Sequence, residues 1–259
     1  MKYESIGFMG GGRITRIILG GLKRAGKFPR KVVVSDTNAD VLSRLIKEFP
    51  GIIPTGEDNS GPAACDMVLV SLHPPVLMDA LQQVKSAIKP ETVVVSLAPK
   101  LTLSKLSAIL DRHARILRMI PNAPSIVNRG YNPVAFSRAI GKDEKAALLD
   151  LFKVLGECPE VPEKNLEVYA IITAMGPTYM WFQWQALMDL GRSFGLHEEV
   201  LRESMGKMLE GTIHTMFASG LNSGEVMDLV PVKPLAEDEE AIRDMYTNRL
   251  TALFNRLKG

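Results

Sequence analysis

A group of glycines near the start of the chain has the residue types and spacing needed to bind a phosphate group. Gly10, Gly11 and Gly12 follow a short apolar run and Thr15 comes next, so the segment reads Gly-x-Gly-x-x-Thr. Glycine permits a sharp turn and lets a pyrophosphate approach bare backbone, while the N-terminus of a following helix supplies N–H donors. The segment therefore predicts a dinucleotide-binding loop. A plain strand-to-helix turn is the simpler alternative.

An acidic residue stands where such a loop needs one. Asp36 ends the second strand-like run, at the distance from the glycines where a carboxylate binds the adenosine ribose hydroxyls. An acid there repels a 2′-phosphate, so Asp36 favours NAD over NADP. Arg13 and Arg44 could still reach such a phosphate, and Asp36 could be only a turn residue. We expect NAD(P)H as the cofactor, with a preference for NAD.

The first part of the chain alternates between strand-like and helix-like segments. Short runs rich in Val, Ile and Leu are typical of parallel strands covered on both faces. These runs are residues 5–9, 31–35, 67–71, 92–97 and 115–119, with 131–136 and 157–161 as further strands that extend the sheet's edge. Helices are expected after Asn38, which can cap a first turn, and over residues 79–88 and 103–111. The alternation predicts right-handed βαβ units and a doubly wound α/β sheet of the Rossmann type.

The pattern changes after Pro162. Residues 163–259 read as helix, with breaks at Gly195, at 220–224 and at 231–234. We therefore expect a dinucleotide-binding domain over residues 1–162 and an all-α domain over residues 163–259. Residues 168–188 carry no charge and approach the length of a membrane span, but Gly176-Pro177 and two glutamines interrupt them. A buried or subunit-interface helix is the favoured interpretation.

Composition narrows the class of protein. Hydrophobic residues make up 46% of the chain and charged residues 23%, as in ordinary soluble globular proteins. The net charge of +2, with acids interspersed among the bases, argues against a nucleic-acid partner. Cys65 and Cys158 form neither a disulfide framework nor a metal-ligand spacing. We therefore expect no metal site. No signal peptide is evident, so we expect a cytoplasmic protein.

Several segments resemble the pyrroline-5-carboxylate reductase family, whose members make proline from a cyclic imine. Residues 6–12 are similar to the family's glycine loop, and residues 70–74 resemble its "AVKP" strand end, with His73 in place of lysine. Residues 118–124 are similar to its "RVMPNTP" stretch, the most specific match in the first half. Residues 176–196 resemble the helical segment "GPAYVFLFIEALADAGVRLGL". The resemblance extends from about residue 6 to residue 230.

The resemblance implies a Rossmann domain followed by an all-helical domain that dimerises through interlocking helices. The helix carrying Met180, Trp181, Phe182 and Trp184 would then be covered by a partner chain rather than lie at the centre of a monomer. It implies hydride transfer from NAD(P)H to a C=N bond, or a C=O bond, of a small molecule. The residues expected at the cofactor are Gly10, Gly11, Gly12, Arg13, Ile14, Asp36, Ser71, Leu72, His73, Pro74, Ala98 and Asn122.

The sequence departs from the family on the substrate side. The family's "TSPGGTT" loop, which grips a carboxylate, corresponds here to residues 231–237, Pro-Val-Lys-Pro-Leu-Ala-Glu. Two prolines remove N–H donors, and the hydroxyls and glycines are absent. The residues expected to line the substrate pocket are Met175, Gly176, Pro177, Thr178 and Lys233, of which Lys233 alone could replace the lost anion contact. We expect an imine or carbonyl compound other than pyrroline-5-carboxylate, either larger or without a carboxylate.

No residue stands out as catalytic. A protonated iminium is already electrophilic, whereas a carbonyl compound would need a proton donor. Asn122, Tyr179 and Lys233 are the candidates, and His73 lies at a strand end where ligands gather. A rival hypothesis is a non-catalytic dinucleotide-binding sensor or scaffold that has lost its substrate loop. A third is a deazaflavin- and NADP-dependent reductase, whose N-terminal domain is similar but whose second half is a poor match.

Overall fold

The computed structural model describes residues 3–258. The chain divides into two compact units. The first runs up to Met175 and also takes in the chain from Leu253 onward, and the second is Gly176–Ala252.

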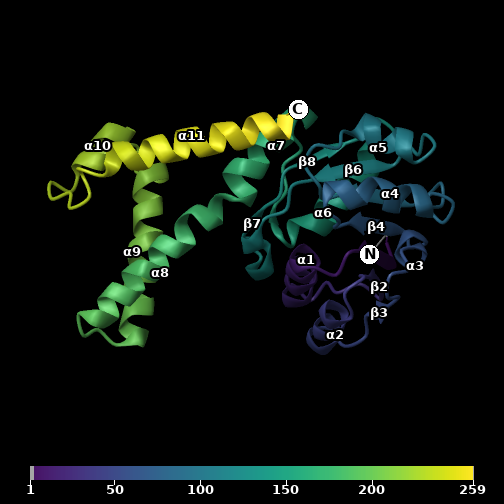
Figure 1. The fold of residues 1–259 in the computed structure, drawn as a ribbon, viewed down its shortest axis with the longest axis horizontal. Helices are drawn as coiled ribbons and strands as arrows, with labels where there is room; N and C mark the ends of the chain where they lie inside the picture. The colour runs from purple at the N-terminus through teal and green to yellow at the C-terminus, as the bar shows by residue number, and fades with distance from the viewer. Residues whose placement is uncertain (1–2, 259) are drawn as a thin grey trace. The chain divides into compact units, whose positions relative to one another are not determined.

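The first unit is built around a seven-stranded sheet with the order β3-β2-β1-β4-β5-β6-β8 (Figure 1). Its strands are β1 (Ser5–Met9), β2 (Lys31–Ser35), β3 (Ile53–Pro54), β4 (Met67–Val70), β5 (Val93–Ser96), β6 (Ile116–Met119) and β8 (Val134–Phe136). Neighbouring strands are parallel except β8, which is antiparallel to β6. The strand order reverses between β1 and β4, as it does in a doubly wound sheet. The predicted fold class is confirmed.

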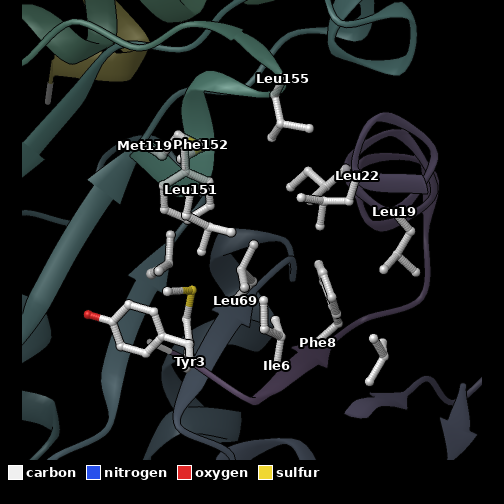
Figure 2. Packing of buried hydrophobic residues seen from close by; sticks show 14 of the residues in the cluster. Tyr3, Ile6, Phe8, Leu19, Leu22, Leu69, Met119, Leu151, Phe152 and Leu155 are labelled. Carbon is white, nitrogen blue, oxygen red and sulfur yellow. The ribbon is translucent and has the colours of Figure 1, made fainter. Parts of the chain in front are cut away.

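Helices cover both faces of this sheet. The helices of one face are α1 (Arg13–Arg24), α2 (Ala39–Glu48) and α6 (Lys142–Lys153), and those of the other are α3 (Ser60–Ala63), α4 (Pro74–Val84) and α5 (Leu103–Ile109). Figure 2 shows the first core, where Phe8 and Leu69 from the strands pack with Leu19, Leu22 and Phe152 from the helices. The strands β1, β2, β4, β5 and β6 are largely buried on both faces, so most of their residues are apolar, whereas both residues of the edge strand β3 are exposed.

Two helices follow local signals in the sequence. The Asn38 side chain caps α2 by accepting from the backbone N–H groups of Asp40 at 2.9 Å and Val41 at 3.3 Å, as predicted. Helix α4 starts at Pro74, earlier than the predicted residue 79, because proline suits the first turn of a helix. It ends at Val84, ahead of the predicted residue 88. The elements β3, α3 and α6 were not expected from the sequence.

The edge strand predicted at residues 131–136 is confirmed for its second half, β8, which extends the edge of the main sheet, but its first half belongs to a different sheet. β7 (Gly130–Tyr131) pairs with β9 (Gly156–Glu157) in a separate two-stranded sheet, while β8 joins the main one. Pro133 has no N–H to continue a ladder, and the Asn132 N–H donates to the carbonyl of Glu157. The strand predicted at 157–161 shrinks to β9 and an isolated bridge between Val134 and Glu160.

Residues 163–174 are helical, as expected, but they pack in the first unit rather than with the later helices. They comprise η2 (Glu163–Asn165), α7 (Leu166–Tyr169) and a π-helix, η3 (Ala170–Ala174). Leu166, Ala170 and Ile171 are buried. The compact units therefore divide after Met175, whereas the sequence pattern changes at Pro162.

The second unit consists of helices: α8 (Gly176–Ser193), α9 (Glu198–Ala218), α10 (Ser223–Asp228) and the part of α11 (Glu239–Lys258) that precedes Leu253. The breaks expected at Gly195, at 220–224 and at 231–234 are all present. Large apolar side chains stay open to solvent here: Phe182 is 67% exposed, Phe194 80% and Phe217 83%. Within residues 3–258 no helix is both long enough and apolar enough to cross a membrane.

Candidate cofactor site

The carboxyl ends of the parallel strands lie side by side along one edge of the sheet. Met9 at the end of β1 is in register with Ser35 of β2 and with Val70 of β4, and Val70 is in register with Ser96 of β5. The residues that follow these strands therefore share one edge, which we call the carboxyl edge. Ligands of open α/β sheets bind at this edge, where the strand order reverses.

The glycine loop occupies this reversal point. Gly10 has a φ of 98° and donates its N–H to the carbonyl of Ser35 at 2.9 Å. A Cβ on Gly10 would lie 3.0 Å from the carbonyl oxygen of Ser71, so the position suits glycine on both conformational and steric grounds. The buried Thr15 hydroxyl donates to the Gly10 carbonyl at 2.5 Å and holds the turn.

The first turn of α1 is open at its N-terminal end. Gly12 caps the helix without a side-chain hydrogen bond, and no acidic residue occupies the first turn. A Cβ placed on Gly12 would meet nothing within 4 Å. Arg13 is exposed and Ile14 is half-buried. Because the first N–H groups of a helix have no partner inside it, this end can accept an anion such as a pyrophosphate. The described residues thus fit the group that the sequence pattern implies.

Asp36 lies beside the glycine loop. Its Oδ2 accepts from the Gly11 N–H at 2.8 Å, and its Oδ1 accepts from the Asn38 N–H at 2.8 Å. These bonds fix the carboxylate at the end of β2. A negative charge is therefore held where an adenosine ribose would lie.

The other expected cofactor residues also lie on the carboxyl edge. The Ser71 hydroxyl lies 3.2 Å from the Thr15 hydroxyl, within hydrogen-bond distance, and Leu72 is half-buried. His73 is exposed and begins α4 as a cap without a side-chain bond, with Pro74 as the first helical residue. Ala98 is buried just after β5. The structure thus brings these segments together with the glycine loop.

Asn122 follows β6 on the same edge and is 7% exposed. Its Oδ1 accepts from the Tyr131 N–H at 3.0 Å, and its Nδ2 donates to the Thr173 carbonyl at 3.4 Å. Its own N–H donates to Asn132 Oδ1 at 3.0 Å. Both ends of the amide are thus engaged with the protein backbone. Because Nδ2 carries two N–H groups and Oδ1 two lone pairs, these bonds leave capacity for the cofactor contact expected from sequence.

The residues expected at the substrate are spread over both units. Met175 ends the first unit, and Gly176, Pro177 and Thr178 begin α8 in the second. Lys233 lies on a cavity of about 720 Å³ in the second unit, together with Gln183, Arg243 and Tyr246.

Tyr179 and Thr178 line a different, mainly apolar cavity of about 470 Å³, with Phe182 and Met245. The Tyr179 ring packs edge-on against Tyr246, and burial raises the pKa of the Tyr179 hydroxyl. Within the second unit, the candidate proton donors Tyr179 and Lys233 therefore lie on separate cavities.

Sequence reasoning missed an ionic network beneath the carboxyl edge. Arg118 is 1% exposed, and its guanidinium pairs with Glu163 at 3.0 Å and with Glu167 at 2.6 Å. Glu163 also accepts from the Leu103 N–H at 2.6 Å, and Glu167 from the Lys100 N–H at 3.2 Å. Arg118 stands in a recognisable motif, but nothing local in the sequence reveals partners so far along the chain. Among residues 3–258 no group of three or more His, Cys, Asp or Glu side chains could hold a metal ion.

Comparisons with known proteins agree with this arrangement. Pyrroline-5-carboxylate reductase of Escherichia coli (strain K12) is 24% identical over 241 residues, covering 93% of this chain and 89% of the relative. Pyrroline-5-carboxylate reductase 3 of Bos taurus is 27% identical over 226 residues, covering 86% and 72%. The chain is thus similar to pyrroline-5-carboxylate reductases over most of its length. Residues 5–100 match the model of a family described as NADP oxidoreductase, coenzyme F420-dependent, which is the N-terminal similarity expected from sequence.

Solved structures of pyrroline-5-carboxylate reductases share the fold. The enzyme from Plasmodium falciparum, solved with NADP bound, superposes with a TM-score of 0.84 at 20% identity and covers 100% of this chain and 98% of its own. The enzyme from Streptococcus pyogenes gives 0.78 at 16% identity, with 98% of each chain covered. At these identities the likeness concerns the fold, which combines the Rossmann sheet with the later helices.

Proposed function

We propose that this relative of the pyrroline-5-carboxylate reductases is an NAD(P)H-dependent reductase that acts on a C=N bond, or a C=O bond, of a small molecule. The observation that carries the proposal is the arrangement at the end of β1. Gly10 turns with a positive φ, Gly12 leaves the N-terminus of α1 open, and Asp36 is bonded to Gly11. These features favour a dinucleotide, and the relatives are named for reduction of a cyclic imine.

Different residues of the chain would bind different parts of the cofactor. The N–H groups at the start of α1 would hold the pyrophosphate, and Asp36 the adenosine ribose hydroxyls. Ser71, His73 and Ala98 lie on the other side of the strand reversal, where the nicotinamide half would lie. The bound cofactor supplies a hydride to the electrophilic carbon. The carboxylate of Asp36 supports a preference for NADH, because it would repel the 2′-phosphate that NADPH carries and NADH lacks.

The proton donors and the loop at residues 231–237 bear on which substrate the chain would reduce. A protonated iminium needs no further proton as the hydride arrives, because its nitrogen already carries one. A carbonyl compound would take a proton from a side chain such as Tyr179 or Lys233. The loop at 231–237 holds two prolines and no hydroxyl, so we expect a substrate other than pyrroline-5-carboxylate.

The proposal includes a homodimer formed through the helices of the second unit. None of the residues of α8 is buried, and Trp181 and Phe182 are 47% and 67% exposed. Exposed apolar surface of this extent marks an interaction site, and a second copy of the chain is the partner that we propose. The free, buried Cys65 and Cys158 suit a cytoplasmic setting.

The full chain, purified alone, tests the proposal when it is mixed with NADH or NADPH and a panel of cyclic imines and ketones. We expect oxidation of the nucleotide by at least one imine, at a turnover of about 1–1000 per second. Tight nucleotide binding without turnover on any compound would instead support the sensor hypothesis. Ordinary turnover of pyrroline-5-carboxylate would leave the reductase proposal intact but overturn the expected change of substrate.

A further inference from the structure

The backbone carbonyl of Thr173 accepts a hydrogen bond from a side chain of another element. In an α-helix each carbonyl accepts from the N–H four residues along the chain, and four residues after Thr173 stands Pro177, which has no N–H. The Asn122 side chain provides a donor, because its Nδ2 donates to the Thr173 carbonyl at 3.4 Å. A carbonyl removed from water without a donor is costly. The residue that follows β6 thus supplies the N–H that Pro177 lacks.

The turn that contains Thr173 is a short π-helix. In η3 the Met175 N–H donates to the carbonyl of Ala170, five residues back, at 3.0 Å. The Thr173 hydroxyl donates to the carbonyl of Tyr169 at 2.8 Å. π-Helical turns are rare and often occur at functional sites. This one lies where the chain passes from the first unit into the second, because the units divide after Met175. We call residues 170–175 the exit turn.

Asn122 is held in place on the carboxyl edge. Its side chain is buried, its backbone N–H donates to Asn132 Oδ1 at 3.0 Å, and its Oδ1 accepts from the Tyr131 N–H at 3.0 Å. An amide nitrogen carries two N–H groups and an amide oxygen two lone pairs, so one of each can serve a ligand. These two groups are complementary to a second carboxamide, such as that of nicotinamide. β6 lies beyond β5, on the side of the strand reversal proposed for the nicotinamide half.

We propose that Asn122 couples dinucleotide binding to the exit turn. Its amide binds the nicotinamide carboxamide and the Thr173 carbonyl together, so the nucleotide binds best when the turn is formed, and it stabilises the turn in return. Hydrogen bonds that share one amide group strengthen each other, which transmits the effect. This deepens the proposed function, on which it rests, because it gives the cofactor site a means of ordering the segment that leads into α8. Toward the exit turn Asn122 is a positioning residue, since it acts through the Thr173 carbonyl.

Four substitutions separate the parts of this arrangement. Asn122→Ala removes the whole amide, whereas Asn122→Asp keeps an acceptor for the Tyr131 N–H and loses the donor for the Thr173 carbonyl. Thr173→Val is the matched control, because it removes the hydroxyl of that residue and keeps its carbonyl. Pro177→Ala places an N–H four residues after Thr173, so the helix can then bond this carbonyl itself.

The measurement is hydrogen exchange of the backbone amides in the full chain, with and without a saturating amount of NADH or NADPH, whichever binds more tightly. In wild type and Thr173→Val the nucleotide should slow exchange in the exit turn about tenfold or more. In Asn122→Ala and Asn122→Asp this slowing should fall below about twofold. Residues 10–16, at the glycine loop, should still be protected by the nucleotide in both variants. A general loss of folding or of binding would abolish that protection too.

Pro177→Ala provides a second readout, which needs no nucleotide. Combined with Asn122→Ala, it should restore exchange in the exit turn to within about threefold of the nucleotide-bound wild type, both with and without nucleotide. This rescue is expected because a main-chain N–H replaces the amide of Asn122 at the Thr173 carbonyl. A residue that only supported the local fold would not be rescued by an N–H at that one position.

The outcomes separate this proposal from the proposed function. The coupling is overturned if the nucleotide slows exchange in the exit turn equally in wild type and Asn122→Ala, or does not slow it in wild type. It is also overturned if Pro177→Ala does not rescue Asn122→Ala. Reduction of an imine in those cases would leave the proposed function intact. If the coupling is observed and no imine or ketone is reduced, the proposed function fails and the coupling stands. A wild-type chain that binds neither nucleotide overturns both.

Discussion

The carboxylate of Asp36 accepts a hydrogen bond from the backbone N–H of Gly11, with 2.8 Å between Oδ2 and the nitrogen. This hydrogen bond therefore joins the acid at the end of β2 to the glycine loop at the end of β1. Asp36 has two effects that can be separated by experiment. In the proposed cofactor site its charge would face the ribose, and its hydrogen bond to Gly11 supports the glycine loop.

Replacement of Asp36 should change the choice of nucleotide. In Asp36→Ser the repulsion of a 2′-phosphate is gone, so the preference for NADPH relative to NADH should rise about tenfold or more. Fluorescence titration of each reduced nucleotide measures this. Asp40→Asn removes an exposed charge from the first turn of α2 and should leave the preference as it is. An unchanged preference in Asp36→Ser would mean that Asp36 does not face the ribose.

Gly10→Ala should weaken both folding and nucleotide binding. The left-handed backbone costs a residue with a Cβ about 1–2 kcal/mol of unfolding free energy. The added methyl would also press on the Ser71 carbonyl, 3.0 Å away. Gly26→Ala is the matched control, because Gly26 has a φ of 65° with nothing within 4 Å of its Cβ. It should lose similar stability in urea and keep its NADH affinity. Equal affinities in the two variants would contradict the role of the loop.

Phe182→Glu should break the proposed dimer. Phe182 is 67% exposed on α8, and a charge there would have to be desolvated beneath a partner chain. Sedimentation should show half the wild-type mass. Val76→Glu, which alters a side chain that is 58% exposed on α4 in the other unit, should keep the wild-type mass. A dimer that survives Phe182→Glu would place the interface elsewhere.

His113 should make folding sensitive to acid. Its Nε2 lies 2.9 Å from the Thr92 carbonyl, and burial lowers the pKa of the ring below its ordinary 6.5. The unfolded chain then binds a proton that the folded chain resists. Stability is therefore retained above pH 6.5 and is lost as the pH falls through the folded pKa.

In His113→Gln the loss of folding stability that His113 causes at low pH should be absent. The measurement is the unfolding free energy of wild type and of His113→Gln in urea, at about pH 7.5 and at about pH 5. The difference between the two proteins should be smaller at the lower pH. A constant difference between them would show that His113 does not contribute to the pH dependence.

The glycine loop, Asp36 and the cap at Asn38 were readable in the sequence because each depends on neighbours a few residues away. The strand pattern also reflects a local rule, since a strand buried on both faces must be apolar along its length. The split near Pro133 has a local signal as well, because proline has no N–H to continue a strand ladder.

The positions of the candidate site residues relative to one another depend on folding at long range. Arg118 pairs with Glu163 and Glu167, and the left-handed turn at Lys100 is held by the same glutamate that neutralises the guanidinium. No periodicity or spacing in the chain encodes such a pairing. The pairing forms because a buried charge is costly unless an opposite charge lies beside it, and the fold brings these residues together. The sequence by itself thus determined the fold class and the dinucleotide loop. Only the tertiary structure decided that residues 163–174 pack with the first unit and that two glutamates of this segment pair with the buried Arg118.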